Sequence, residues 1–327
     1  MHTYITRDCN VTGNDDPEWT TVLISGSNDV ARETPAPSNA PADYSGSYCQ
    51  RCSAKRVQCC VPICSFDCVD TRAVEAARRI VERMLEHCQP AVVHRMAAAG
   101  CSVAVIGRGQ VTSDMPPHNF LKGIQASLGQ RSYDDGCRGV GGTVHVPCTS
   151  VGEENLLGEK IGGDPHFKQE SILVHEFSHA VMNIGLTDEA RGRIAAAFTN
   201  ARLSGDFDND SYMMSNAEEF WAEGAQAWFH ASMRSDVNCG INTRAAVIER
   251  APELAALLRE AFGDGPWRYD TSDENCHAWS ICNDRLLLTQ APHPKSESED
   301  EDEPWNSAAM TAGRYLSDGG KNNAGAR

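Results

Sequence analysis

The most chemically specific pattern in this chain is a pair of histidines four residues apart, His175 and His179, with Glu176 directly after the first. Residues four apart lie on one face of a helix, so both imidazoles can bind the same metal ion. Glu176 then lies beside the ion without binding it, where its carboxylate can accept a proton from an attacking water. The pattern His-Glu-x-x-His is typical of zinc hydrolases, and we predict a catalytic zinc site here.

The residues around this pattern have the spacing of a helix. Apolar side chains recur at helical intervals from Ile172 to Ile184, and Gly185 is well placed to end the helix. We therefore predict a helix over about residues 170–184 that holds both histidines. The alternative is that His175 and His179 are ordinary core or surface residues of an amphipathic helix.

A catalytic zinc site needs a third protein ligand and one open position. Metzincins supply a histidine in the continuation x-x-Gly-x-x-His, which this chain lacks after His179. Gluzincins instead use a glutamate from a downstream helix, and residues 216–223 contain three. Glu219 and Glu223 share a helix face, whereas Glu218 is rotated by about 100° from Glu219. We predict that Glu219 is the ligand and that Glu223 orients a ligand histidine; an ordinary acidic helix face is the alternative.

Both segments together resemble a known peptidase family. Tyr212 lies seven residues before Glu219, and this arrangement, with the two motifs His175-Glu-Phe-Ser-His179 and Glu219-Phe-Trp-Ala-Glu223, resembles the catalytic domain of anthrax lethal factor and its relatives, including Pro-Pro endopeptidases. The resemblance implies a zincin-like α+β fold of the gluzincin type. It also implies that Glu219 completes the zinc site and that the Tyr212 hydroxyl faces the substrate carbonyl.

The resemblance covers about residues 71–269, although only residues 171–185 and 212–228 carry specific motifs. It implies further that the strand containing Gly141-Gly142-Thr143 is an edge strand to which an extended peptide adds.

The remaining elements are expected from hydrophobic periodicity. We predict a helix from Thr71 onward, strands at 101–107 and 139–146, and helices at about 188–203, 216–233 and 243–262. The result is an α+β domain in which a mixed sheet precedes the active-site helix and a helical lobe follows it.

The composition changes along the chain and predicts four segments. Residues 1–47 are expected to be a disordered leader or linker, 48–70 a cysteine-rich segment, 71–285 the peptidase domain, and 286–327 an acidic disordered tail. The cysteine-rich segment holds few large apolar residues, so cross-links must stabilise it. We predict disulfides, with structural zinc as the alternative.

Charge and cysteine content limit the partners and the compartment. The chain has 29 Lys and Arg against 45 Asp and Glu, and its net charge of -16 disfavours nucleic acid and anionic membrane surfaces. It has no apolar run of the roughly 18 residues that a membrane span needs. Its 14 cysteines favour an extracellular compartment, although no signal peptide is visible at the start.

We therefore expect a secreted zinc metalloendopeptidase that takes Zn²⁺ as its cofactor and hydrolyses peptide or protein substrates. The alternative function is a catalytically inactive secreted zincin-fold binding protein. The intact Glu176 and Tyr212 speak against it, because a site without turnover would be free to lose either residue.

Overall fold

A computed structural model of the chain describes residues 19–23, 61–125, 132–158 and 169–269. In this part, a five-stranded sheet has the order β1-β2-β3-β5-β4. The strands are β1 Trp19–Leu23, β2 Pro62–Phe66, β3 Ser102–Ile106, β4 Gly139–Val140 and β5 Cys148–Gly152. The three middle strands run parallel, and β1 and β4 pair antiparallel at the two edges. The structure is therefore a mixed α+β fold.

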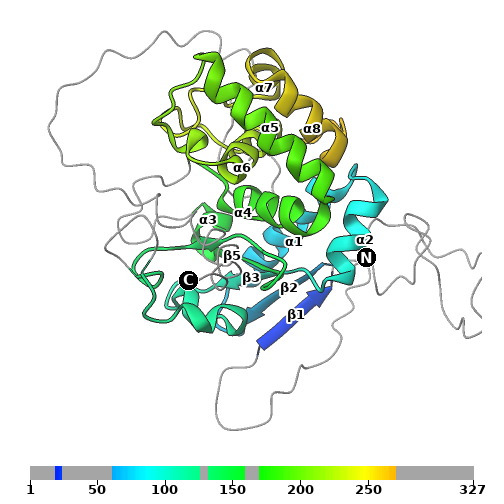
Figure 1. Cartoon of the computed structure of the whole chain (residues 1–327). Coiled ribbons are helices and arrows are strands. Elements are labelled where there is room, and N and C mark those ends of the chain that lie inside the picture. Colours follow the sequence, from blue (N-terminus) through cyan, green and yellow to red (C-terminus); the bar gives the residue numbers. More distant parts are fainter. Residues whose placement is uncertain (1–18, 24–60, 126–131, 159–168, 270–327) are drawn as a thin grey trace, which may run out of the picture.

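Helices cover one face of the sheet and continue away from it (Figure 1). The helices are α1 Thr71–Leu85, α2 Pro90–Ala98, α3 Glu153–Leu157, α4 Ile172–Ala180, α5 Asp188–Ser204, α6 Ala217–Trp228, α7 Arg244–Arg250 and α8 Pro252–Phe262, with short 3-10 helices at Thr112–Asp114, Pro116–Leu121 and Tyr212–Met214. Helix α4 contacts β5 and β4 of the sheet as well as α1 and α6. It therefore lies between the sheet and the helices of the second half of the chain.

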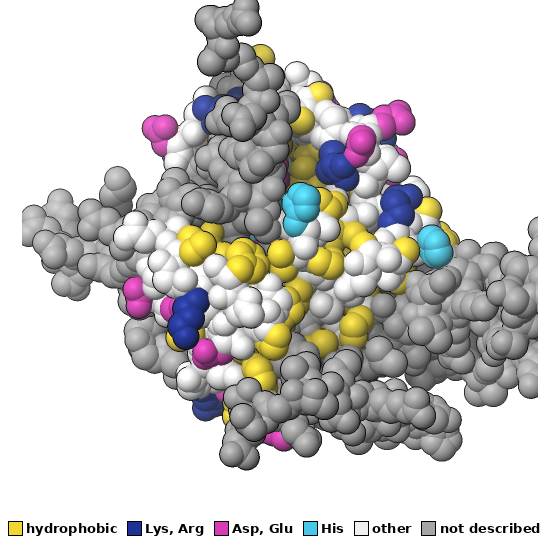
Figure 2. Space-filling view, turned by 60° about the horizontal axis from the view of Figure 1, so that its bottom comes forward, with side chains coloured by type: hydrophobic (Ala, Val, Ile, Leu, Met, Phe, Trp, Pro, Cys, Tyr) yellow, Lys and Arg dark blue, Asp and Glu magenta, His cyan; other side chains and the backbone are white. Residues whose placement is uncertain are grey.

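Successive side chains of β3 point to opposite faces of the sheet and so belong to two different hydrophobic clusters. Val103 and Val105 belong to the large core under α1 and α4, whereas Ala104 and Ile106 pack with Met115 on the other face of the sheet. Figure 2 turns this second side forward, and in its described part hydrophobic side chains gather in the middle while most charged ones lie towards the margins. The larger core is on the α4 side, so α4 is held by apolar packing along much of its surface.

Several expected elements agree with the structure. The helix from Thr71 and the strand at 101–107 are confirmed as α1 and β3. The helix at 170–184 is confirmed as α4, which continues as one π-helical turn, Val181–Gly185. The helix at 188–203 is confirmed as α5.

Three expected elements differ in extent. The strand at 139–146 ends at Val140, because the chain then turns and the Thr143 amide donates to the Val146 carbonyl at 2.9 Å. The helix at 216–233 ends at Trp228. The helix at 243–262 is two helices, α7 and α8, because Pro252 has no amide hydrogen to continue the first. Helices α2 and α3 and strands β1, β2 and β5 were not expected, and β1 lies within residues 1–47, which were expected to be a disordered leader or linker.

The cysteines require a correction. We expected disulfides, but Cys68, Cys101, Cys137, Cys148 and Cys239 are not in disulfides. Three of them are buried in three different hydrophobic clusters, and burial raises the pKa of Cys137 and Cys148 to about 12, so their thiols stay protonated. Strand β2 lies within the cysteine-rich segment and contains Cys64, whereas cysteines 49, 52, 59 and 60 of that segment lie outside the described residues, as do residues 286–327.

Across the described part of the chain, every helix is too short or too polar to cross a lipid bilayer.

Candidate metal centre

Two capped helices carry the candidate ligands. The Ser171 hydroxyl accepts a hydrogen bond from the Val174 amide and begins α4, and the Asn216 side chain accepts one from the Glu219 amide at 2.9 Å and begins α6. His175 and His179 of α4 and Glu219 of α6 lie where the two helices contact each other. As a result His175, His179 and Glu219 are all buried, at 1%, 5% and 2% exposure.

The three predicted ligands converge on one point. The Nε2 atom of His175 lies 3.1 Å from the Nε2 atom of His179 and 3.1 Å from Oε2 of Glu219. The Nε2 atom of His179 lies 3.5 Å from the same carboxylate oxygen. All three ligand atoms lie within 4.8 Å of one another, whereas Glu218 is exposed. Two imidazoles and a carboxylate are a donor set that catalytic zinc uses, so the residues fit the ion.

The electrostatics of the cluster favour a cation. Burial alone would lower the pKa of His175, but the hydrogen bond and charge of Glu219 raise it to about 10. Burial alone would raise the pKa of Glu219, yet the charge of His179 and the hydrogen bonds of both histidines lower it to about 2. Burial raises the pKa of Glu176 and of Glu223 to about 8 each. The ionised Glu219 carboxylate therefore stabilises positive charge where the ring nitrogens of the two histidines meet.

The second ring nitrogen of His175 has a neighbour, Gln226, that we did not predict. Nδ1 lies 3.3 Å from Oε1 of Gln226 and 3.6 Å from Oε1 of Glu223. The Gln226 amide nitrogen donates to the Ser171 carbonyl at 3.1 Å, and it lies 3.5 Å from Glu170. Gln226 is seven residues after Glu219, so helical spacing alone could have indicated it.

Glu170, the neighbour of Gln226, forms a buried ion pair. Arg234 Nη1 lies 3.0 Å from Oε1 of Glu170, and both side chains are 3% exposed. Arg234 also contacts Asp236 at 2.7 Å. A chain of polar contacts therefore leads from Arg234 through Glu170 and Gln226 to His175.

Tyr212 is near the converging donors. It begins the 3-10 turn before α6, and the next residue donates its amide hydrogen to the Val237 carbonyl at 2.7 Å. The rings of Tyr212 and His175 have centroids 6.4 Å apart, and the Tyr212 hydroxyl is buried. Burial, together with the charge of Glu219, raises the pKa of Tyr212 well above its usual value. Its side chain is thus a neutral phenol that can donate a hydrogen bond.

Glycines let the edge strand approach α4 closely. A Cβ atom on Gly139 would lie 2.4 Å from Cγ2 of Ile172 and 3.0 Å from Oε1 of Glu176. One on Gly141 would lie 2.7 Å from the Cβ atom of His179. The backbone from β4 onward therefore passes directly beside the residues of the His-Glu-x-x-His pattern. Gly141 was expected at the substrate edge, whereas Gly139 was not.

No known family model matches the chain, and no curated protein sequence does. Among solved structures, the chain is similar to the Pro-Pro endopeptidase PPEP-2 of Paenibacillus alvei, with 17% identity and a TM-score of 0.41. The similarity covers 58% of this chain and 91% of that chain. A likeness of this size does not define an activity, so we infer the function from the arrangement of the donor atoms.

Proposed function

We propose that this protein is a zinc-dependent metalloendopeptidase of the gluzincin type, with His175, His179 and Glu219 as the zinc ligands. The observation that supports the proposal is the group of three buried ligand atoms within 4.8 Å of one another. Glu176 follows the first ligand on the same helix and is itself buried at 1% exposure. This combination supplies a metal position and a carboxylate beside it, which hydrolysis of a peptide bond requires.

Each residue then has a separate task. When bound, zinc acts as a Lewis acid that polarises the carbonyl of a peptide bond and makes water more acidic. The Glu176 carboxylate accepts the proton of the attacking water and delivers it to the leaving amine. The Tyr212 phenol donates a hydrogen bond to the oxygen that becomes negative in the tetrahedral species. Glu223 and Gln226 hold the His175 ring in place.

The edge of the sheet suggests how a peptide substrate is held. In the described part of the chain, β4 is the strand at the end of the sheet next to α4. An extended peptide can add to such an edge through main-chain hydrogen bonds. Gly139 brings this edge against Glu176, so a peptide on β4 would lie next to the proton acceptor.

The zincin-like organisation, the kinship with lethal factor, disulfides among Cys49, Cys52, Cys59 and Cys60 and the extracellular location belong to the same proposal. They are supported by the two sequence motifs and by the cysteine content of the chain. Mass spectrometry of the unreduced protein tests these disulfides directly, because mostly reduced thiols at the four cysteines would contradict them and would remove the support for secretion.

The function is tested by metal analysis and by digestion of a peptide library with and without a chelator. We expect about one zinc per chain, cleavage that the chelator stops, and recovery when zinc is restored. Glu176→Gln should keep zinc and lose at least about 100-fold in turnover, since an amide cannot accept the proton. Zinc binding without any cleavage by the wild type would favour the catalytically inactive binding protein.

A further inference from the structure

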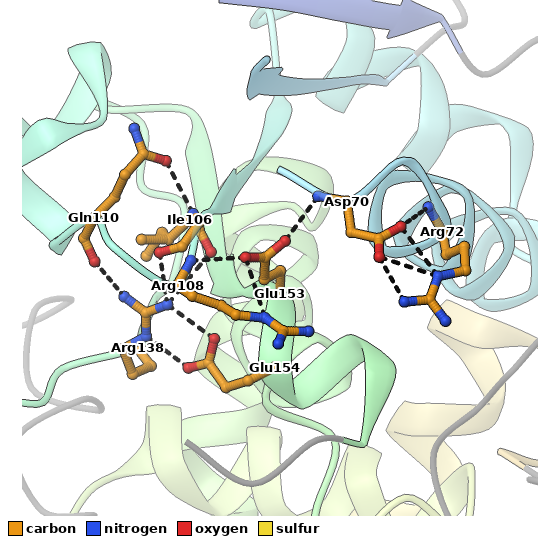
Figure 3. Close-up of polar contacts among 9 residues, drawn as sticks. Asp70, Arg72, Ile106, Arg108, Gln110, Arg138, Glu153 and Glu154 are labelled. Atoms are coloured by element: carbon orange, nitrogen blue, oxygen red, sulfur yellow. Dashed lines mark hydrogen bonds and ion pairs between the residues drawn. The ribbon is translucent and has the colours of Figure 1, made fainter. Parts of the chain in front are cut away.

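Arg138, the residue before β4, is bound to the start of α3 by a two-pronged ion pair. Its Nε atom lies 2.6 Å from Oε1 of Glu154, and its Nη2 atom donates to Oε2 at 2.8 Å (Figure 3). The Glu154 side chain is 6% exposed and that of Arg138 is 21% exposed. A planar guanidinium that meets a carboxylate in this way fixes both the distance and the orientation of the two groups.

The same guanidinium also binds the end of β3. Nη1 donates to the Gln110 carbonyl at 2.6 Å, and Nη2 lies 3.1 Å from the Gly107 carbonyl and 3.3 Å from that of Ile106. Figure 3 shows Gln110, Ile106 and the Glu154 carboxylate around Arg138. A lysine ammonium cannot occupy all these positions, because it lacks the rigid fork of an arginine. Arg138 therefore joins three segments that are far apart in the sequence.

The short helix α3, which carries Glu154, also forms hydrogen bonds with the start of α4. The next residue, Asn155, donates its side-chain amide to the Glu170 carbonyl at 2.9 Å and accepts a hydrogen bond from the Ile172 amide at 2.9 Å. Ile172 is the first residue of α4. Arg138 and the first turn of α4 are thus fixed to neighbouring residues of one short helix.

The contact between Gly139 and Glu176 joins β4 directly to α4, in addition to the polar contacts through α3. Gly139 follows Arg138 directly and lies so near Glu176 that a Cβ atom would be 3.0 Å from its carboxylate. The position of β4 relative to Glu176 is therefore determined twice, by packing at Gly139 and by the polar contacts through Glu154 and Asn155.

We propose that Arg138 is a positioning residue, which through Glu154 sets the spacing between edge strand β4 and Glu176 and so aligns an extended peptide with the site. This inference rests on the proposed peptidase function. It assigns no chemical step to Arg138.

Arg108 offers a matched control within the same cluster. Oε1 of Glu153 accepts the Arg108 backbone amide at 2.7 Å, and Oε2 accepts that of Asp70 at 2.8 Å (Figure 3). The Arg108 side chain itself is 46% exposed, and its Nε atom lies 3.6 Å from Glu153. Replacing this side chain leaves the backbone hydrogen bond in place, so Arg108→Lys changes an arginine of the cluster without releasing β4.

The kinetic test compares Arg138→Lys and Glu154→Gln with Arg108→Lys in the zinc-loaded full-length chain, using a peptide that the wild type cleaves. Since misplacement of a substrate by about 1 Å can cost about 100-fold in rate, we expect kcat/KM to fall at least about tenfold in the first two variants, mainly through kcat. Zinc content should stay at the wild-type level, and Arg108→Lys should stay within about twofold of wild type. Unchanged kcat in both Arg138→Lys and Glu154→Gln would overturn the proposal.

Hydrogen exchange of the metal-free proteins supplies a readout that does not depend on activity. We expect faster exchange of the amides in residues 137–142 in Arg138→Lys and Glu154→Gln, with exchange in α6 unchanged. A uniform increase over the whole chain would instead show a general loss of stability and would contradict a positioning role. If the wild type cleaves no peptide, the proposed function fails, whereas local exchange in 137–142 still reports whether Arg138 holds β4.

Discussion

The two ring nitrogens of His175 have different surroundings. Nε2 faces His179 and Glu219, whereas Nδ1 faces the amide oxygen of Gln226 at 3.3 Å and the Glu223 carboxylate at 3.6 Å. A hydrogen bond from Nδ1 fixes the tautomer that leaves Nε2 available to a metal. Gln226 makes this bond without adding a charge, and Ser171 fixes its amide from the other side. The geometry thus favours Gln226 as the acceptor.

We therefore predict that Gln226→Ala weakens zinc binding by about 10- to 100-fold, the usual cost of losing the partner of a ligand histidine. Competition with a chromophoric chelator measures this affinity. Glu223→Gln is the comparison, because it keeps the shape of the residue and removes its charge. A larger loss in Glu223→Gln than in Gln226→Ala would show that Glu223 orients His175, as the helix spacing first suggested.

The variant Tyr212→Phe removes the hydroxyl but keeps the ring, so it distinguishes a chemical role of the hydroxyl from a packing role of the ring. The ring stays in place, so zinc binding should be normal and the free energy of unfolding should change by no more than about 1 kcal/mol. Loss of a donor to the oxyanion should lower kcat by about 100- to 1,000-fold, with a smaller change in KM. Steady-state kinetics beside a urea unfolding curve measures both. Wild-type turnover in this variant would contradict the assigned role of Tyr212.

At the scale of elements, the close approach of β4 and α4 is the feature that shapes the site. The helix turns the side chains of Glu176 and His179 towards β4 and the turn after it, where residues 139, 141 and 142 are glycines. Side chains at these positions would separate the strand from the helix. Glycine therefore serves here as the residue that permits contact between two backbones.

Gly141→Ala tests this contact. The added methyl would lie 2.7 Å from the Cβ atom of His179, so we expect a loss of stability of about 1–3 kcal/mol together with weaker zinc binding. Gly192→Ala in α5 is the control, because nothing lies within 4 Å of its added methyl, and alanine in a helix interior should stabilise by about 1 kcal/mol. Urea unfolding of the two variants gives the free energies. Equal stability in both would show that β4 can move away from α4 at no cost.

At the scale of the whole molecule, the N-terminal part of the chain completes the sheet on which the site is built. Strand β2 lies between β1 and β3 and pairs with both. Its Ile63 is fully buried in the same hydrophobic cluster as Val174 of α4. Residues that precede the site by more than a hundred positions thus contribute to the core that supports α4.

For this reason we predict that a chain beginning at Thr71 does not fold cooperatively. It lacks β2, which leaves one edge of β3 unpaired and exposes part of the core, and burial of a single large aliphatic side chain stabilises by about 1.5–3 kcal/mol. Thermal unfolding followed by circular dichroism compares this chain with the full-length protein. If the shortened chain unfolded cooperatively at nearly the same midpoint temperature as the protein with all 327 residues, residues 71 onward would fold independently and the prediction would be wrong.

The elements that could be predicted are those that local periodicity determines. The apolar spacing of α1, α4 and α5 follows the helical period, and the run at 101–107 has the composition of a buried strand. The extent of β4 could not be predicted in this way. A strand lasts only as long as it stays paired, and β4 pairs with β5 over only two residues although β5 itself runs from Cys148 to Gly152, because the chain turns away after Val140.

The same distinction holds for the site. By itself, the sequence determined that His175 and His179 share a helix face and that Glu219 rather than Glu218 lies on the face shared with Glu223, because these are relations within a single helix. Only the tertiary structure decided that the faces of α4 and α6 meet, that Gln226 is nearer to His175 than Glu223 is, and that Arg138 connects β4 to α3. Contacts between distant segments depend on how the helices and strands pack in three dimensions, and the periodicity of one segment carries no information about its partner.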